Sequence, residues 1–526
     1  MKAVRYIIFF AFGVLAIEMH SQGDALLHLD RPHYLPGQII YYSISSNYNL
    51  PDTCVLGVTL VHDAKKIDLH YLLWLKGYAS GCFQLPFDIP GGIYSLQADV
   101  YMRKSGEKVN IINAPFTVLS GSISTAESPA VVTFDAPQEN TTIKIHWDGT
   151  ARVRDILPCT VKIENGQIND PVSISIKEKN FYGHTSVHRQ SFYLSDESLL
   201  QMIPIKGKRT FLNNKPREDA FLFITNPADL SFSFNWVDAD GDFYVRFPLF
   251  YSKTGLFFVD NGGNDIDVSL SPPLVLNPGS TNVVASPGAK RSIISYNERK
   301  KIYELFSGLE ETVVTEEVSQ VAVPIPDYVV DVQDFSVRGK LVDLLKEITT
   351  PLKFRKLKSD TYTAKILREV LDLKYFYDSD PLFFINGIAT RDFNYLANLP
   401  LQDLKSLEIY ASLQTIRSLK LVDIGGVVAI ETMDPLFSIP EEIRLPGIEV
   451  QGLQIPIRYP VTVNTSSPGP QIKSLLFWQP NGKLDTNGTY VFDLPCSDDL
   501  STFVIEVVHH PSQTVNHTEI KIEYHD

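Results

Sequence analysis

Short runs of alternating apolar and polar residues, divided by prolines and glycines, dominate the chain from about residue 23 onward. One such run, IIYYSI (39–44), follows the corner Pro36-Gly37, and the turn at 90–92 (Pro-Gly-Gly) separates two others. A period of two residues is typical of half-buried strands, and proline and glycine interrupt strands at turns. The pattern therefore predicts a mainly β chain built as tandem β-sandwiches.

The composition is that of a folded, acidic protein. Hydrophobic residues make up 44% and charged residues 21% of the 526 positions, which is the globular range. The formal net charge is −14, so the chain lacks the basic excess that releases phosphate counterions. We therefore expect no nucleic-acid partner.

The first 22 residues are expected to be a signal peptide. Lys2 and Arg5 precede a short apolar run, YIIFFAFGVLAI (6–17), that is too short for a transmembrane helix. Cleavage is expected near Ser21 or Gln22. No later run is apolar for about 18 residues, so we expect an exported chain with no transmembrane span in its mature form.

The four cysteines form no CxxC motif, which removes the usual basis for a zinc site or a thioredoxin-type redox site. Cys54 and Cys82 could pair in an oxidising compartment or remain buried thiols, and both alternatives stay open. The other two are Cys159 and Cys496.

A mixed α and β segment interrupts the strand-rich pattern between 335 and 432. VRGKLVDLLKEI predicts a helix, and DPLFFINGIA predicts a buried strand that ends in a turn at Asn386-Gly387. LPLQDLKSLEIY predicts a short helix and a strand, and GGVVAIET predicts a final strand.

Upstream of this segment, Ser295 and Glu298 form a capping-box pattern before a helical stripe. The acidic stretch 310–328 is predicted to be a linker.

Several acidic and histidine-containing motifs are candidates for metal-binding or catalytic sites. Asp238, Asp240 and Asp242 alternate, but Gly241 lies in the wrong frame for an EF-hand, so a hairpin turn is favoured over calcium binding. His28, Asp30 and His33 could form a metal site or half of a catalytic constellation.

His509-His510 could bind a metal or could lie at an exposed strand end. No HExxH, GxSxG, Walker or Rossmann motif is present. The sequence therefore predicts no catalytic residue, cofactor or metal.

The basic cluster KFRKLK (353–358) is unusual in an acidic chain. It could contact an acidic partner or lipid headgroups, or it could be an edge strand that its charges protect from aggregation.

The segments LHLDRPHYLPGQIIYYSI and SGCFQLPFDIPGGIYSLQADVY resemble the two halves of a macroglobulin-type β-sandwich. That resemblance explains Asp30 and Arg31 as turn residues. Alpha-2-macroglobulins trap proteases through a thioester between the Cys and Gln of a C-G-E-Q motif. Here GCFQ sets Cys82 and Gln84 two positions apart, so the resemblance does not extend to a thioester.

Two further segments resemble known sandwich families. IPIKGKRTFLNN followed by FSFNWVDADGDFYVRFP resembles a carboxypeptidase regulatory-like domain, with Asp238, Gly241 and Phe243 at its motif positions. IKSLLFWQPNGKLDTNGTYVFDLPCSDDL resembles the C-terminal immunoglobulin-like domain of secreted Bacteroidota proteins, and Trp478 is expected to fill its core.

The mixed segment resembles the plug of a TonB-dependent outer-membrane receptor. The matching pieces are 381–387, 404–409 and 425–432, with Asn386 where that family has Asp. Such receptors enclose the plug in a barrel of 22 strands, each of about 9–11 residues. Only residues 433–526 follow here, so the resemblance implies a plug-like module that stands alone or meets a barrel on another chain.

The predicted fold class is mainly β: tandem Ig-like or macroglobulin-like β-sandwiches with one inserted α+β plug-like domain. The expected domains are a signal peptide (1–22), a macroglobulin-like sandwich (23–120), a second sandwich (121–194), a carboxypeptidase regulatory-like sandwich (195–275), a helix and acidic linker (276–334), a plug-like domain (335–434) and a C-terminal Ig-like sandwich (435–526).

The resemblances imply a non-enzymatic protein exported to the periplasm or outer-membrane surface of a Gram-negative bacterium. It would act as a structural or interaction subunit with protein partners in the cell envelope, an outer-membrane barrel protein among the candidates. The alternative is a hydrolase, or a protease-associated accessory factor, for polysaccharide or protein breakdown.

Overall fold

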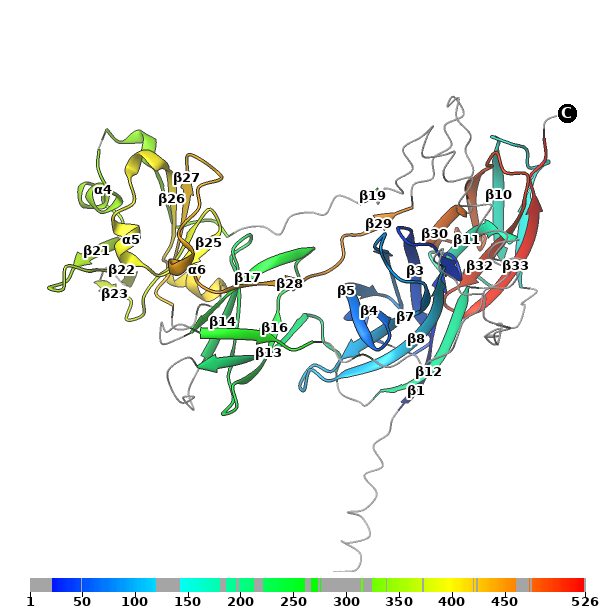
Figure 1. Cartoon of the computed structure of the whole chain (residues 1–526), viewed down its shortest axis with the longest axis horizontal. Helices are drawn as coiled ribbons and strands as arrows, with labels where there is room; N and C mark the ends of the chain where they lie inside the picture. Colours follow the sequence, from blue (N-terminus) through cyan, green and yellow to red (C-terminus); the bar gives the residue numbers. More distant parts are fainter. Residues whose placement is uncertain are drawn as a thin grey trace, which may run out of the picture. The chain divides into compact units, whose positions relative to one another are not determined.

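The computed structural model forms two compact units along the chain (Figure 1). The first contains 1–201, 273–318 and 453–526, and the second contains 202–272 and 319–452. The structure describes residues 21–48, 50–119, 142–179, 186–194, 198–211, 221–260, 266–272, 275, 314–315, 324–336, 338–370, 373–419, 421, 424–459, 473 and 475–524. Residues 1–20 of the predicted signal peptide, the predicted helix after Ser295 and most of the acidic linker lie outside these residues, whereas Ser21 and Gln22 belong to the first strand.

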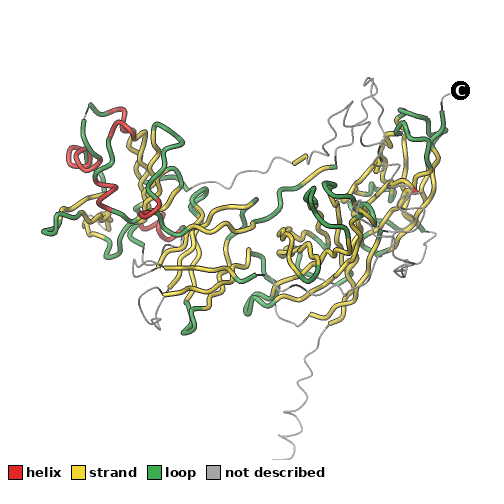
Figure 2. Tube along the Cα trace, viewed as in Figure 1, coloured by secondary structure: helices red, strands yellow, loops and turns green. Residues whose placement is uncertain are grey.

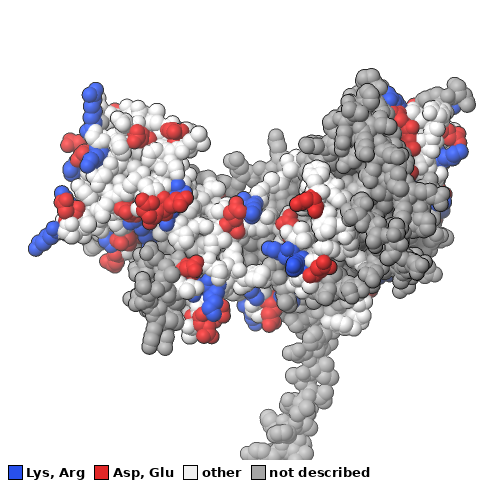
Figure 3. All heavy atoms as spheres, in the orientation of Figure 1, with Lys and Arg blue, Asp and Glu red and all other residues white. Residues whose placement is uncertain are grey.

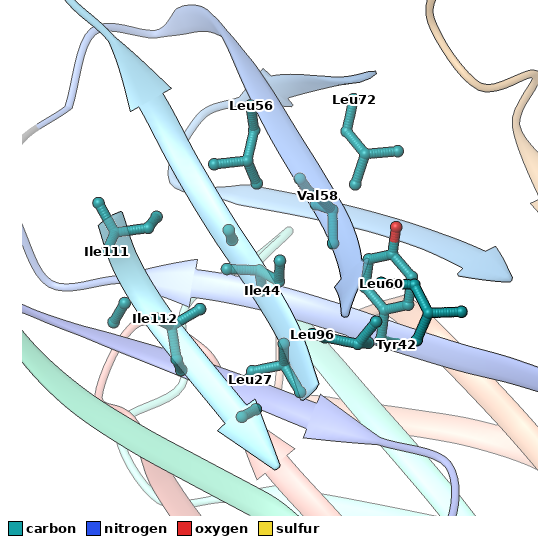
Figure 4. Close-up of a cluster of buried hydrophobic side chains, with 14 of the residues drawn as sticks. Leu27, Tyr42, Ile44, Leu56, Val58, Leu60, Leu72, Leu96, Ile111 and Ile112 are labelled. Carbon is teal, nitrogen blue, oxygen red and sulfur yellow. The ribbon is translucent and has the colours of Figure 1, made fainter. Parts of the chain in front are cut away.

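The first unit begins with a nine-stranded sheet whose strand order is β12-β1-β3-β6-β5-β4-β7-β8-β2. Its strands curl around one apolar core that includes Leu27, Tyr42, Leu56 and Ile112 (Figure 4). The bounds are β1 Ser21–Leu29, β2 His33–Tyr34, β3 Ile39–Ser46, β4 Thr53–His62, β5 Lys65–Leu75, β6 Tyr78–Gln84, β7 Gly92–Tyr101, β8 Lys108–Val118 and β12 Val187–Leu194.

The same unit contains a sandwich made from two distant parts of the chain. One sheet has the order β31-β10-β9 and the other β30-β11-β32-β33, around a shared core (Figure 1). The strands are β9 Ile143–Trp147, β10 Ile156–Ile163, β11 Pro171–Glu178, β30 Leu475–Lys483, β31 Thr489–Pro495, β32 Thr502–His509 and β33 Thr514–Lys521. A two-stranded pair, β19 Val314–Thr315 with β29 Ile457–Arg458, also belongs to this unit.

This arrangement corrects the expected domain boundaries. Residues 121–194 and 435–526 were predicted as separate sandwiches, but β10 pairs with β31, and β11 lies between β30 and β32. Neither half can close a sandwich alone, because each supplies strands to both sheets. The strand β12 instead pairs with β1 of the first sheet.

The second unit contains a sandwich of two sheets, β16-β13-β18 and β15-β14-β17-β28. At its hairpin, the Asp238 carboxylate accepts hydrogen bonds from the N–H groups of Asp240 and Asp242, at 3.0 and 2.7 Å, as the turn interpretation predicted. The bounds are β13 Ile203–Phe211, β14 Phe221–Asn226, β15 Ser231–Trp236, β16 Asp242–Phe247, β17 Lys253–Asp260, β18 Ile266–Leu270 and β28 Gly447–Gln451.

The rest of the second unit is an α+β module (324–445). Its main sheet has the order β20-β26-β27-β24-β25, and β21, β22 and β23 form a smaller sheet. The bounds are β20 Tyr328–Asp331, η1 Val332–Asp334, α4 Leu341–Glu347, β21 Leu352–Lys356, β22 Tyr362–Val370, β23 Leu373–Phe376, β24 Leu382–Ile385, β25 Ile388–Thr390, α5 Phe393–Ala397, η2 Leu401–Asp403, β26 Leu404–Tyr410, α6 Leu413–Ser418, β27 Val427–Thr432 and η3 Glu441–Ile443.

The turn between β24 and β25 confirms the prediction for Asn386-Gly387. Both residues have positive φ, 46° and 79°, as a two-residue type I′ hairpin requires. The Asn386 amide donates to Thr432 Oγ1 at 2.6 Å and accepts from Thr432 N–H at 3.0 Å. An aspartate could accept but could not donate, so the asparagine joins this turn to the end of β27 in a way that aspartate cannot.

The two modules of the second unit share a core cluster. Phe223 and Phe232 of the sandwich pack with Phe384, Tyr410 and Val427 of the α+β module. Strands predominate throughout the described residues, and the named helices lie within 332–443, which agrees with the predicted fold class (Figure 2). No described helix is long and apolar enough to cross a membrane.

Trp478 is buried, as expected, but not in the core of its own sandwich. Its side chain packs with Ile39, Tyr41 and Cys82 of the nine-stranded sheet, and its ring meets the His28 ring edge-on at 4.9 Å. The tryptophan therefore joins two sandwiches, because it lies on the opposite face of β30 from the adjacent core residue Phe477.

We predict that Trp478→Ala lowers the free energy of unfolding by about 3–5 kcal/mol, the usual cost of truncating a buried large aromatic residue. Urea denaturation measures the change. Trp236→Ala is the matched control, since that side chain is 52% exposed and its loss should cost less than about 1 kcal/mol. Equal losses in the two variants would contradict the assigned packing.

Candidate functional site

A buried polar cluster joins the nine-stranded sheet to the two-part sandwich. Lys177 Nζ lies 2.8 Å from Glu506 Oε1, and both side chains are fully buried. His28 of β1 places Nε2 3.2 Å from the same oxygen and Nδ1 2.6 Å from Ser173 Oγ. The cluster thus connects β1 with the neighbouring strands β11 and β32.

Ser186 completes the cluster. Its hydroxyl lies 2.6 Å from Lys177 Nζ, 2.7 Å from Glu506 Oε1 and 2.6 Å from the Leu29 carbonyl. Its own carbonyl accepts the Leu29 N–H at 3.0 Å. The ionic pair is therefore surrounded by hydrogen-bonding groups, as a buried charge pair requires.

The charge states follow from burial and from these neighbours. Burial opposes ionisation of Glu506, yet Lys177 and His28 hold the pKa of its carboxyl well below the usual range. Burial lowers the pKa of His28, and Glu506 offsets this only in part. A neutral His28 with its proton on Nε2 can donate to the carboxylate while Nδ1 accepts from Ser173. We interpret the cluster as a structural joint.

The structure separates the residues of the motif 28–33. The Asp30 carboxylate accepts from Tyr34 Oη at 2.5 Å, Tyr41 N–H at 3.0 Å and Arg31 Nε at 2.8 Å. Asp30 therefore fixes the chain at this corner, in keeping with the turn role that the resemblance implied, while His28 belongs to the joint. Among the described residues, no group of three or more His, Cys, Asp or Glu could hold a metal ion.

His509 and His510 are buried, which corrects the expectation of an exposed strand end. His510 Nδ1 lies 2.9 Å from Ser45 Oγ of the nine-stranded sheet, and burial lowers the pKa of this histidine to about 3. His509 has Nδ1 2.6 Å from Ser512 Oγ and Nε2 3.2 Å from Asp170 Oδ2.

The order of hydroxyl, imidazole and carboxylate at Ser512, His509 and Asp170 matches the order of a nucleophile, a base and an orienting acid. Here the hydroxyl also lies 2.8 Å from Thr514 Oγ1, within the turn between β32 and β33. The three residues therefore fasten this turn to the segment before β11. Sequence reasoning missed the arrangement because Asp170 is distant along the chain.

All four cysteines are buried free thiols, which resolves the alternatives left open for Cys54 and Cys82. Burial raises the pKa of each of these two thiols to about 12. Thiols held neutral in this way are poor nucleophiles.

The candidate interaction site lies in the α+β module. Residues 325–436 carry nine of the nineteen exposed large apolar side chains found among the described residues. Four of them lie in β20 or within three residues of the ends of β20 and η1, and they are called the edge patch: Ile325 at 86%, Tyr328 at 47%, Val329 at 63% and Phe335 at 38% exposure. Tyr328 and Val329 are adjacent, so both faces of β20 present an apolar side chain.

The two edges of the main sheet differ. At the β25 edge, Leu445 N–H donates to the Ala389 carbonyl at 2.9 Å, so the chain covers that edge itself. At the other edge, β20 pairs with β26, and no second described strand pairs with it. The strand β20 therefore combines an open edge with the edge patch.

The ends of β20 are held firmly. Asp327 accepts the N–H groups of Ala411 and Ser412 at 2.6 and 2.7 Å and the Thr415 hydroxyl at 3.0 Å. Burial opposes ionisation, but these hydrogen bonds hold the pKa of Asp327 below its ordinary value. At the other end, Gln333 Nε2 donates to the Leu404 carbonyl at 3.2 Å. The open edge is thus preorganised, which lowers the cost of binding there.

Comparisons with known proteins give no family assignment. No protein-family model and no curated protein matches the sequence. Among solved structures, Salmonella alpha-2-macroglobulin reacted with methylamine is 8% identical with a TM-score of 0.24, over 96% of this chain and 40% of that one. Native E. coli alpha-2-macroglobulin is 8% identical with a TM-score of 0.25, over 96% and 40%. The chain spans less than half the length of these neighbours, and the match carries no argument about activity.

We predict that Lys177→Met costs about 3–5 kcal/mol of unfolding free energy, because it leaves the Glu506 carboxylate buried without its counterion. Lys405→Met is the matched control: its pair with Glu431 is 59% exposed on both sides, so its loss should cost far less than the loss of Lys177. Denaturant titration compares the two. Adding Glu506→Gln to Lys177→Met should recover part of the lost stability. Equal losses for Lys177→Met and Lys405→Met would show that the buried cluster does not stabilise the fold as described.

Proposed function

We propose that this chain is a non-enzymatic, exported protein of the Gram-negative envelope that binds a partner protein through the open edge of β20. The observation that carries the proposal is the combination of that edge with the edge patch. An extended segment of a partner can add to such an edge through backbone hydrogen bonds, while apolar side chains on both faces supply specificity.

The class of partner rests on the resemblance of 381–432 to a receptor plug. A plug-like module with an open edge suits contact with the strands or loops of an outer-membrane barrel protein. The two β-sandwich modules of the first unit would then act as a structural support. This partner and this compartment are those expected from the sequence, and the experiment below tests them.

We expect Tyr328→Glu/Val329→Glu to reduce recovery of the barrel partner at least tenfold in a crosslinked pull-down from solubilised envelopes. Two charges would meet the apolar contacts of the partner and would be costly to bury there. The matched control is Tyr193→Glu/Val491→Glu, since these side chains are 56% and 63% exposed in the first unit. Mass spectrometry identifies the partner and maps the crosslinks.

Crosslinks from 325–335 to a barrel protein, lost in the β20 variant and kept in the control, would support the proposal. Equal recovery with both variants, or crosslinks that map only to the first unit, would refute it. Circular dichroism of both variants verifies that the fold is kept.

The alternative function, a hydrolase, has one geometric support in the arrangement of Ser512, His509 and Asp170. A fluorophosphonate probe that labels the wild-type protein but not Ser512→Ala would favour this alternative over the leading proposal.

A further inference from the structure

The basic cluster predicted from KFRKLK lies on a hairpin of the α+β module, formed by β21 and β22. Its cations are Lys353, Arg355, Lys356 and Lys358, within six consecutive residues of a chain whose net charge is −14. In the space-filling view, Lys and Arg atoms (blue) project at the end of the module that carries this hairpin (Figure 3). The strand β21 is an end strand of its sheet, as the sequence predicted.

Strand register places Lys353 and Arg355 on the outer face of this small sheet. Leu352 and Ile366 are partners on the inner face and belong to the apolar core. Because side chains alternate along a strand, Lys353 and its partner Lys365 lie on the outer face, and Arg355 lies beside them.

Only part of this charge is neutralised within the protein. Lys356 pairs with Asp360 at 2.5 Å, and Lys365 pairs with Asp380 at 3.0 Å. In the part of the chain that the structure describes, no acidic side chain forms an ion pair with Lys353, Arg355 or Lys358. Three cations thus remain available to an external anion.

Exposed apolar side chains accompany these cations. Leu357 lies between two lysines at the turn of the hairpin and is 45% exposed. On β23, Tyr375 and Phe376 are 48% and 51% exposed, and Phe376 is the partner of Leu367 on the outer face. Cations mixed with an exposed leucine and aromatic rings are typical of surfaces that bind at the interface of an anionic bilayer.

We propose that the outer face of β21, β22 and β23 is a docking surface for anionic lipid headgroups. The unpaired cations Lys353, Arg355 and Lys358 would contact the headgroup phosphates, while Leu357 and Phe376 enter the interfacial layer. An anionic bilayer offers phosphates above an apolar interior and so matches both the cations and the exposed apolar side chains of this face. This inference is independent of partner binding at β20.

The test is co-sedimentation of the full mature chain with vesicles of phosphatidylcholine, either alone or with 30% phosphatidylglycerol as the named probe. We expect a partition coefficient at least tenfold higher with phosphatidylglycerol, reduced by added salt. Lys353→Gln/Arg355→Gln/Lys358→Gln should lose most of this preference, since each cation contributes about a fivefold factor near an anionic surface. Leu357→Ser/Phe376→Ser should weaken binding and leave its salt dependence unchanged.

The matched control is Lys65→Gln/Lys66→Gln/Lys162→Gln, which removes three exposed lysines elsewhere and changes the net charge equally. This control, and the β20 variant Tyr328→Glu/Val329→Glu, should both bind as the wild-type protein does. Equal binding to the two vesicle types, or equal losses in the two triple variants, would overturn the proposal. Binding to a polyglutamate peptide without any preference for anionic vesicles would also overturn it and would assign the surface to an acidic protein.

Discussion

The first unit depends on the pairing of β11 between β30 and β32. These neighbours lie about 300 positions further along the chain, so the sandwich closes only when residues 453–526 return to strands made from 143–178. The second unit is therefore an insertion within a sandwich rather than a link in a linear series of domains. The entropic cost of closing a loop grows only slowly with the length of the loop, so an insertion of this size is tolerated. Folding of the sandwich nevertheless depends on contacts between residues that are distant in the sequence, and such contacts form slowly.

The pairing of β11 with distant strands also builds the contact between this sandwich and the nine-stranded sheet. Along β11, Val172, Ile174 and Ile176 face the apolar core, and Ser173, Ser175 and Lys177 face the other way. That second face is also buried, against a nine-stranded sheet that presents His28. The polar face of β11 thus meets that sheet, and the Lys177–Glu506 pair lies in the contact. Hydrogen-bonded networks of this kind fix one arrangement of neighbouring elements, which we take to be their role here.

Much of the local structure could be predicted from the sequence. The turns at Asn386-Gly387 and at Asp238 follow from residue types with strong turn preferences, and the strands follow from their alternation. In 335–432, the expected helix α4 and the expected strands β24, β26 and β27 are present, but β22, β23 and α6 were not predicted. Each of the correctly predicted features depends on residues that are close together in the sequence.

The features that were predicted wrongly from the sequence share one physical cause. Ser173, Ser175 and Lys177 have the pattern of a solvent-facing strand side, and nothing local reveals that a second sandwich covers them. Trp478 was assigned to the wrong core for the same reason. The open edge of β20 was likewise beyond local reasoning, because an edge is defined by the absence of a neighbouring strand in three dimensions.

A disulfide between 143–178 and 475–521 tests whether these two parts of the chain form one sandwich. Thr160 and Val491 are register partners on an outer face, and cross-strand partners have the Cα separation that a disulfide needs. Thr160→Cys/Val491→Cys should crosslink under mild oxidation of the folded protein, visible by non-reducing electrophoresis, because the four native thiols are buried. The control variant Thr160→Cys/Leu500→Cys should not crosslink. If Thr160→Cys/Val491→Cys forms no disulfide, or if both variants crosslink equally, the two parts of the chain do not form one sandwich.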